Sequence, residues 1–144
     1  MAFETIIPDL LIKPLSEREV EGGRLLPLLE FDDHLLRRFG RMELIVLRAN
    51  ARLQPILREV ADEVWLTLEG EIEGFWLDRR PNSPSTGICE KHLLPAQSLA
   101  LVPFGVAFAC RTGTEACTLL RVMTHAPDPT EKPSDISWEE LLEG

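Results

Sequence analysis

Three arginines and one glutamate are the side chains of this sequence best suited to bind or transform a small anion: Arg52, Arg58, Arg121 and Glu63. The planar guanidinium group of arginine can bind a diphosphate or a carboxylate through two parallel hydrogen bonds. A glutamate whose pKa is raised by burial can act as a general base. The same residue types also form structural ion pairs, so a pair between Glu63 and Arg58 or Arg121 is the alternative interpretation.

Two aromatic residues, Trp65 and Phe108, complete the candidate ligand-binding set. On strands that line a barrel they could contact a ligand, whereas as core residues, together with Met123, they would fill the interior. An open, polar interior with convergent arginine and glutamate side chains would favour an enzyme, and a filled interior would favour a non-catalytic scaffold. Residue types alone are compatible with both.

The composition excludes several classes of function. No apolar run approaches the roughly 20 residues of a membrane helix, so we expect a cytoplasmic protein that does not act on membranes. The 144 residues carry a net charge of −9, which would repel the phosphate backbone of a nucleic acid. The chain contains no tyrosine, so no phenol can serve as an acid or a base.

These side chains must be positioned by strands, because the dominant hydrophobic period of the chain is two. Residues 63–68 alternate between apolar and polar positions, and further strand-forming runs cover residues 42–49, 72–78, 98–102, 106–111 and 116–123. Short strands without long helical patterns between them predict an antiparallel sandwich or barrel. We expect helix only in short pieces, at residues 16–21, 32–39 and 137–142.

Two turns between these strands are typical of hairpins. Gly70 is placed to turn the chain between residues 63–68 and 72–78. A second turn at residues 113–114 would place Cys110 opposite Cys117 on paired strands. The two cysteines would then be either buried thiols, as expected in a reducing compartment, or a redox-sensitive disulfide; Cys89 lies on another segment.

The chain is expected to have two parts, a β-barrel domain over residues 1–125 that includes an N-terminal strand segment, and a tail over residues 126–144. The tail contains six acidic residues, one lysine and three prolines, which favours an extended path. Trp138, Leu141 and Leu142 would then form a short helical turn. That turn could dock on a neighbouring subunit.

One loop resembles a known family. The residues DRRPNSPSTG at 78–87 are similar to the D-x-R-x-x-S-P-T-x-G loop of the dTDP-4-dehydrorhamnose 3,5-epimerase family of RmlC-like cupins, with Ser85 in place of threonine. Glu63, Gly70 and the P-x-G at 103–105 follow the order of the two cupin motifs, and weaker similarity occurs at residues 23–25, 39–41 and 128–131. The resemblance covers about residues 12–138. It implies an all-β fold, a double-stranded β-helix or jelly roll, in a protein that is usually a dimer.

The same resemblance shows which family residues this chain has lost. The family carries an H-x-H or H-x-x-Q element where residues 54–60 contain no histidine, and Phe108 occupies the position of the third cupin histidine. Glu63 alone would not hold a transition metal, so we expect neither a metal nor another cofactor. His34 and His125 lie outside the ligand positions, as does His92, which we expect in a partly exposed loop.

The resemblance also implies a mechanism whose parts are missing. Epimerases of this family use a histidine and a tyrosine, and this chain has neither at the family positions. We therefore expect a non-catalytic cupin of sugar-nucleotide epimerase descent that binds a small anionic ligand, a nucleotide sugar or a protein partner. The alternative is a nucleotide-sugar isomerase or epimerase in which Glu63, or Glu59, is the base and arginines hold the diphosphate.

Overall fold

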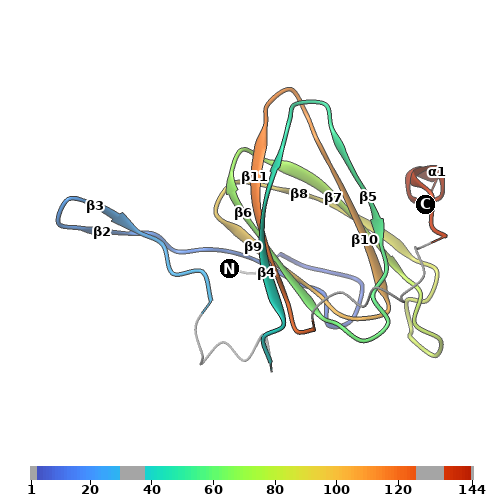
Figure 1. The fold of residues 1–144 in the computed structure, drawn as a ribbon. Helices are drawn as coiled ribbons and strands as arrows, with labels where there is room; N and C mark the ends of the chain where they lie inside the picture. Colours follow the sequence, from blue (N-terminus) through green and yellow to red (C-terminus); the bar gives the residue numbers. More distant parts are fainter. Residues whose placement is uncertain (1–2, 30–37, 126–134, 144) are drawn as a thin grey trace.

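Two antiparallel β-sheets face each other across an apolar core in the computed structural model of the chain, which describes residues 3–29, 38–125 and 135–143 (Figure 1). The larger sheet has the strand order β1 (Leu11–Pro14), β9 (Ser98–Val102), β6 (Glu63–Glu69), β11 (Cys117–Met123) and β4 (Arg41–Leu47). The smaller sheet has the order β5 (Arg52–Ile56), β10 (Val106–Thr112), β7 (Ile72–Asp78) and β8 (Cys89–Leu94). A separate hairpin of β2 (Arg18–Val20) and β3 (Gly23–Leu25) extends away from both sheets (Figure 1).

Successive strands mostly alternate between the two sheets. From β4 to β7 each strand lies in the sheet opposite the one before it, and the chain alternates again from β8 to β11. This winding is that of a double-stranded β-helix, and it confirms the predicted all-β fold. The strands expected from the sequence are present, and β1, β2, β3, β5 and β8 are additional.

The strand β6 is buried on both of its faces, although its sequence alternates between apolar and polar positions. Trp65 belongs to the core between the sheets, whereas Val64 and Leu66 lie in a second cluster on the outer side. Leu15 and Leu28, from the chain segment before β4, pack against that outer cluster. The N-terminal segment therefore replaces solvent on this face of the larger sheet.

The turn at Gly70 is a corner between the sheets and not a hairpin, so the hairpin prediction was wrong. β6 belongs to the larger sheet and β7 to the smaller. Gly70 has a φ of 77°, and a Cβ atom at this position would lie 2.3 Å from the backbone oxygen of Ala116. Ala116 lies in the corner between β10 and β11, so the two corners pack against each other and exclude a side chain at residue 70.

The expected pairing of Cys110 with Cys117 was also wrong. β10 pairs with β5 and β7, and β11 pairs with β4 and β6, so residues 113–116 join opposite sheets. Cys110 and Cys117 are buried free thiols in the common core, and Cys89 is free as well. Burial raises the pKa of the Cys117 thiol to about 11 and raises that of Cys110 further, which keeps both thiols protonated.

One of the expected helices was wrong and another is confirmed. Residues 16–21, expected as helix, form part of the β2–β3 hairpin, whose turn contains Gly22 with a φ of 89°. Residues 32–37 of the second expected helix lie outside the described residues. The third is the helix α1 (Trp138–Glu143). Within the described segments, no helix is long and apolar enough to cross a membrane.

Helix α1 packs on the outer side of the smaller sheet (Figure 1). Ile136, Trp138 and Leu141 form a buried cluster with Phe75 and Leu77 of β7. The indole Nε1 of Trp138 donates a hydrogen bond to the backbone oxygen of Leu53 at 3.2 Å. The end of the tail is therefore docked on its own chain, whereas residues 126–134 lie outside the described part.

Candidate functional site

Five of the six predicted ligand-binding residues come together in the interior between the sheets. Glu63 and Trp65 lie on β6, Phe108 on β10 and Arg121 on β11, and Arg58 follows β5. Trp65 and Phe108 belong to the same buried core cluster although they come from opposite sheets. The structure adds Glu43 of β4, and we call Glu43, Arg58, Glu63 and Arg121 the inner charge cluster.

Both carboxylate oxygens of Glu63 accept hydrogen bonds. Arg58 Nε donates to Oε2 at 3.2 Å, and Trp65 Nε1 donates to Oε1 at 3.1 Å. The side chain of Glu63 is 3% exposed and that of Arg58 is 20% exposed. The ion pair considered for Glu63 is therefore present, and Arg58 is its partner.

Arg121 occupies the centre of three neighbouring strands. Its register partners are Glu43 on β4 and Trp65 on β6, and its guanidinium group pairs with the carboxylate of Glu43. The guanidinium carbon also lies 5.2 Å from the ring centroid of Trp65, which is a cation–π distance. Burial opposes ionisation of Glu43, but Arg121, with Arg41 and Arg58 nearby, outweighs it and lowers the pKa of that carboxyl.

A row of rings crosses the interior from this cluster toward β8. The centroid of Trp65 lies 4.9 Å from that of Phe108, Phe108 lies 5.2 Å from Trp76, and Trp76 lies 5.7 Å from His92. We call these four residues the aromatic row. Trp65, Trp76 and Phe108 are buried, as is Met123, so these side chains fill the centre of the barrel.

A carboxylate–imidazole pair that the sequence did not predict lies at the far end of this row, with Glu90 buried and His92 partly buried. His92 lies on β8 and not in a loop, and its Nε2 is 2.6 Å from Glu90 Oε2. Glu90 also accepts hydrogen bonds from the backbone amides of Ile6 and Ile7. Glu90 thereby holds the N-terminal segment against β8, which is a structural role.

Arg52 is the one predicted ligand-binding residue that the structure places elsewhere. Its guanidinium carbon lies 5.0 Å from the ring centroid of Trp138, next to helix α1 on the outer side of the smaller sheet. The register of β5 against β10 shifts between Phe108 and Cys110. This irregularity interrupts the alternation of sides along β5, so that Arg52 pairs with Arg111 on the outer side of the sheet.

The loop that carries the family resemblance is organised around Asp78, which is completely buried. One oxygen, Oδ1, accepts hydrogen bonds from the backbone amide and Nε of Arg80, both at 3.0 Å. The other oxygen, Oδ2, accepts from the hydroxyls of Ser83 and Ser85, both at 2.6 Å, and from Arg80 Nη2. Burial opposes the charge, but these bonds outweigh it and hold the pKa of Asp78 far below its usual value. The loop is therefore a structural element, closed by bonds within residues 78–87.

The described residues contain no candidate metal centre. Within residues 3–29, 38–125 and 135–143, no three histidine, cysteine, aspartate or glutamate side chains are grouped so that they could bind one metal ion. The donors of the inner charge cluster are two carboxylates, each paired with an arginine. This donor set does not fit a transition metal.

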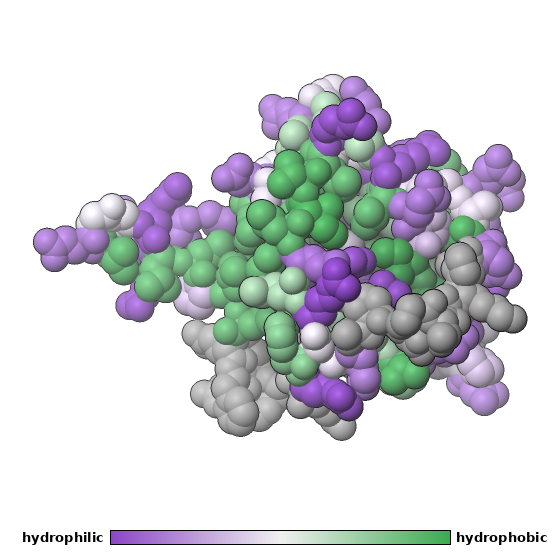
Figure 2. All heavy atoms as spheres, in the orientation of Figure 1, coloured by the Kyte–Doolittle hydropathy of each residue, from purple (hydrophilic) through white to green (hydrophobic). Residues whose placement is uncertain are grey.

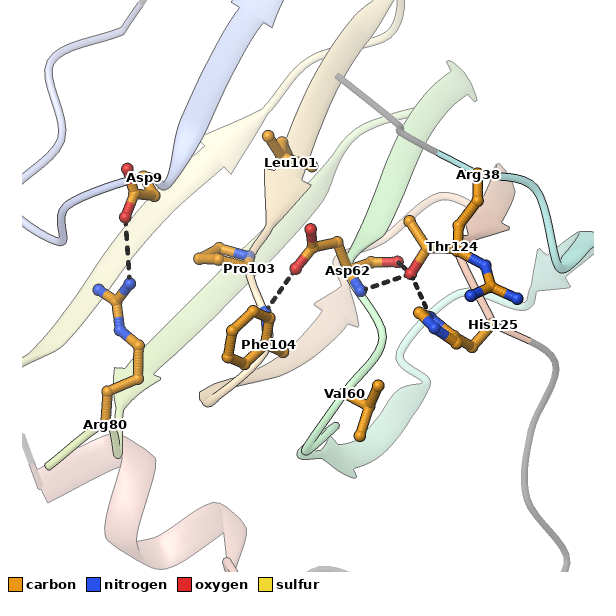
Figure 3. A pocket seen from close by; sticks show the side chains of 10 residues that line it. All are labelled: Asp9, Arg38, Val60, Asp62, Arg80, Leu101, Pro103, Phe104, Thr124 and His125. Atoms are coloured by element: carbon orange, nitrogen blue, oxygen red, sulfur yellow. Dashed lines mark hydrogen bonds and ion pairs between the residues drawn. The ribbon is translucent and has the colours of Figure 1, made fainter. Parts of the chain in front are cut away.

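A pocket of about 590 Å³ lies at one end of the barrel, where β6 begins and β9 and β11 end (Figure 3). Phe104 and Asp62 lie in its middle, Arg38 and His125 at one side, and Arg80 at the other (Figure 3). None of the inner charge cluster lines it. We call this the end pocket.

The antiparallel sheets and their winding define a jelly roll, which is the fold of the RmlC-like cupins. No protein-family model matches the chain, and no curated protein matches it in sequence. Solved structures do match. A dTDP sugar isomerase from Desulfovibrio desulfuricans G20 superposes with a TM-score of 0.82 at 16% identity, covering 94% of this chain and 89% of that one.

Two further structures show the same likeness. RmlC from Streptococcus suis, solved with dTDP-D-xylose, has a TM-score of 0.77 at 18% identity and covers 99% of this chain and 84% of its own. NovW from Streptomyces spheroides, a 4-keto-6-deoxy sugar epimerase, has a TM-score of 0.78 at 15% identity and covers 90% and 70%. At these identities the likeness establishes the fold.

Proposed function

We propose that this chain is a non-catalytic cupin barrel that binds a nucleotide sugar or another small anionic ligand at the inner charge cluster. The observation that carries the proposal is the convergence of Arg58 and Arg121, from different segments, on one site beside the ring of Trp65. Two guanidinium groups at one site suit a diphosphate or a carboxylate, each of which accepts two parallel hydrogen bonds. Proteins of the same fold are described as dTDP-sugar enzymes, which supports this class of ligand.

The non-catalytic part of the proposal is supported by the positions of the groups that could move protons. Epimerisation needs a base on one face of a carbon and an acid on the other. Glu63 is held by Arg58 and Trp65, and His92 lies at the opposite end of the aromatic row. Because buried rings separate the two groups, they cannot act on the same carbon atom.

A nucleotide-sugar isomerase or epimerase is the second candidate, and the interior position of Glu63 favours it. In that mechanism Glu63 removes the proton next to the sugar ketone, while Arg58 and Arg121 hold the diphosphate. Incubation with a dTDP-4-keto sugar in D2O separates the two candidates. Deuterium incorporation at the sugar carbons that is abolished in Glu63→Gln would establish the enzyme and reject the non-catalytic proposal.

Thermal unfolding with a panel of dTDP-, UDP- and GDP-sugars tests the binding proposal, because a ligand that binds only the folded state raises the transition temperature. We expect a rise with at least one of them. Arg121→Gln should abolish the rise, whereas Arg52→Gln should preserve it, since Arg52 also lies over a tryptophan but outside the cluster. No rise with any nucleotide sugar would contradict the proposed ligand class and direct attention to a protein partner.

We further propose that binding requires no metal. This rests on the sequence, because residues 54–60 contain no histidine and Phe108 replaces the third histidine of metal cupins. Elemental analysis of protein purified without a chelator should find no stoichiometric metal. One Fe, Mn, Ni or Zn per chain would contradict the proposal.

We also propose that two copies of the chain form a homodimer through the outer face of β4. Met42, Leu44 and Val46 are all more than half exposed on this edge strand. Figure 2 shows apolar residues gathered over β4 and toward the base of the β2–β3 hairpin. An exposed apolar edge strand is prone to aggregation unless another surface covers it, and a two-fold axis covers two such strands at once.

A further inference from the structure

The end pocket has the size of a small-molecule site and is lined by exposed apolar side chains. Its volume of about 590 Å³ falls within the range typical of ligand pockets. Phe104 is 50% exposed and Val60 is 65% exposed, and both line it beside Pro103. Figure 3 shows the ring of Phe104 in the middle of the pocket. An exposed ring in a hollow offers a planar ligand a stacking surface.

Asp62 fixes this ring and also faces the ligand space. Its Oδ1 accepts the backbone amide of Phe104 at 2.9 Å, which holds the residue in place. No hydrogen-bond partner is found for Oδ2 among the described residues. A carboxylate oxygen in this position accepts a hydroxyl or amine hydrogen from a ligand and repels an anion. The anionic group of a ligand must therefore lie away from Asp62.

The side of the pocket at His125 supplies the opposite charge. Arg38 lies there and has no ion-pair partner among the described carboxylates. Thr124 Oγ1 accepts the amide hydrogen of Asp62 at 2.9 Å, and its own hydrogen has its nearest acceptor in His125 Nδ1 at 2.8 Å. The Nδ1 atom of His125 is thus engaged by Thr124, which leaves Nε2 and the guanidinium group of Arg38 as the donors that this side offers to an anion.

The positive charge on the far side of the pocket, that of Arg80, is already neutralised by carboxylates of the protein. Arg80 pairs with Asp9 at 3.3 Å and with the buried Asp78 at 3.0 Å. It also donates a hydrogen bond to the backbone oxygen of Pro8 at 2.9 Å. Its charge is therefore compensated within the protein, and it leaves the Arg38 and His125 side as the anion subsite.

We propose that the end pocket is a second binding site, separate from the inner charge cluster, for an aromatic acid that carries a hydrogen-bond donor on its ring. The ring lies on Phe104, the ring donor bonds Asp62 Oδ2, and the carboxylate binds Arg38 and the Nε2–H group of His125. This arrangement uses the polar side chains in the middle of the pocket and on its His125 side, namely Asp62, Arg38 and His125.

Amide chemical shifts of the full-length ¹⁵N-labelled protein, titrated with 4-hydroxybenzoate, test the proposal. We expect saturable shifts at Asp62, Phe104 and Thr124 and none at Trp65 or Arg121. Phenol lacks the anion and acetate lacks the ring, so each should bind at least tenfold more weakly. Absence of saturation up to ~10 mM 4-hydroxybenzoate, a Kd too weak for a built site, would overturn the proposal. Shifts centred on the inner charge cluster would overturn it as well.

Two variants and a matched control locate the site. Arg38→Gln and Phe104→Ala should each weaken binding of 4-hydroxybenzoate at least tenfold, and because both side chains are exposed the fold should survive. Arg48→Gln removes another exposed arginine outside the pocket and should leave the affinity unchanged. If all three variants bind as the unaltered protein does, the site lies elsewhere and the proposal is wrong.

Discussion

The buried carboxylate of Asp78 accepts more hydrogen bonds than that of any other acidic residue that the structure describes. Its partners are Arg80, Ser83 and Ser85, all within one loop. Removing the charge would leave buried donors without their acceptor. We expect Asp78→Asn to lower the free energy of unfolding by about 3 kcal/mol, as found when buried ion pairs are broken. Urea unfolding followed by circular dichroism would measure it, and Asp9→Asn is the control, because Asp9 is exposed at the other end of Arg80.

The same carboxylate predicts a dependence of stability on pH. Because the pKa of Asp78 is lower in the folded than in the unfolded chain, its stabilisation is complete above the unfolded value of about 4 and is lost as the pH falls below it. The unaltered protein should therefore lose more stability than Asp78→Asn between about pH 5 and pH 3. Equal losses in the two proteins would show that other groups dominate acid unfolding.

The variant Glu63→Gln distinguishes a structural role of Glu63 in the inner charge cluster from a ligand-binding role. Glu63→Gln keeps an acceptor for Trp65 Nε1 but removes the charge opposite Arg58. We expect a loss of about 2 kcal/mol, below the usual cost for a fully buried pair because Arg58 is partly exposed. Urea unfolding gives the value. Unchanged stability together with a lost response to nucleotide sugars would instead assign Glu63 to the ligand.

At the scale of single residues, the sequence predicted the members of the interior well where strands are regular. Trp65 and Phe108 lie in the core between the sheets, and Arg121 lies beside Trp65 on the same side of the larger sheet. Arg52 lies outside the interior because a register shift interrupts β5, and residue types do not reveal such a shift. His92 was misplaced because the charged sequence around it resembles a loop, whereas cross-strand contact with β7 makes it a strand.

The connections between the two sheets determine the order of the strands. Gly70, in the connection between β6 and β7, is the most sterically constrained residue in them. An added Cβ would meet the Ala116 backbone at 2.3 Å, and the φ of 77° disfavours any side chain. We expect Gly70→Ala to destabilise the protein by at least ~2 kcal/mol. Gly113→Ala, in the neighbouring corner with open space around it, should change stability by less than ~0.5 kcal/mol. Similar effects of the two changes in thermal unfolding would refute the role of close packing.

These corners also explain which part of the topology could not be predicted. A glycine between two strand-like runs is equally typical of a hairpin and of a crossing between sheets, and local periodicity contains no information on which sheet follows. The strand β5 was missed for a related reason, since Pro55 lowers its strand propensity. Proline is nevertheless compatible with an edge strand, and β5 is the edge of the smaller sheet.

The whole molecule is expected to associate through the apolar face of β4. Leu44 lies in the middle of that strand, is 63% exposed and pairs with Leu120 of β11. Leu44→Lys places two like charges near the proposed two-fold axis and should convert a dimer into a monomer, measured as a halved mass in light scattering. Leu93→Lys, on the outer side of β8, is the control and should keep the mass. A monomeric unaltered protein would contradict the proposed dimer.

The positions of the three tryptophans give the interior and the tail separate optical reporters. Trp65 and Trp76 lie in the aromatic row, whereas Trp138 lies between helix α1 and the smaller sheet. In a chain with Trp65→Phe and Trp76→Phe, all indole emission would come from Trp138. Release of the helix would expose that ring to water and shift its emission to longer wavelength while the barrel remained folded. The stability of the docked tail can therefore be determined independently of the barrel that supports it.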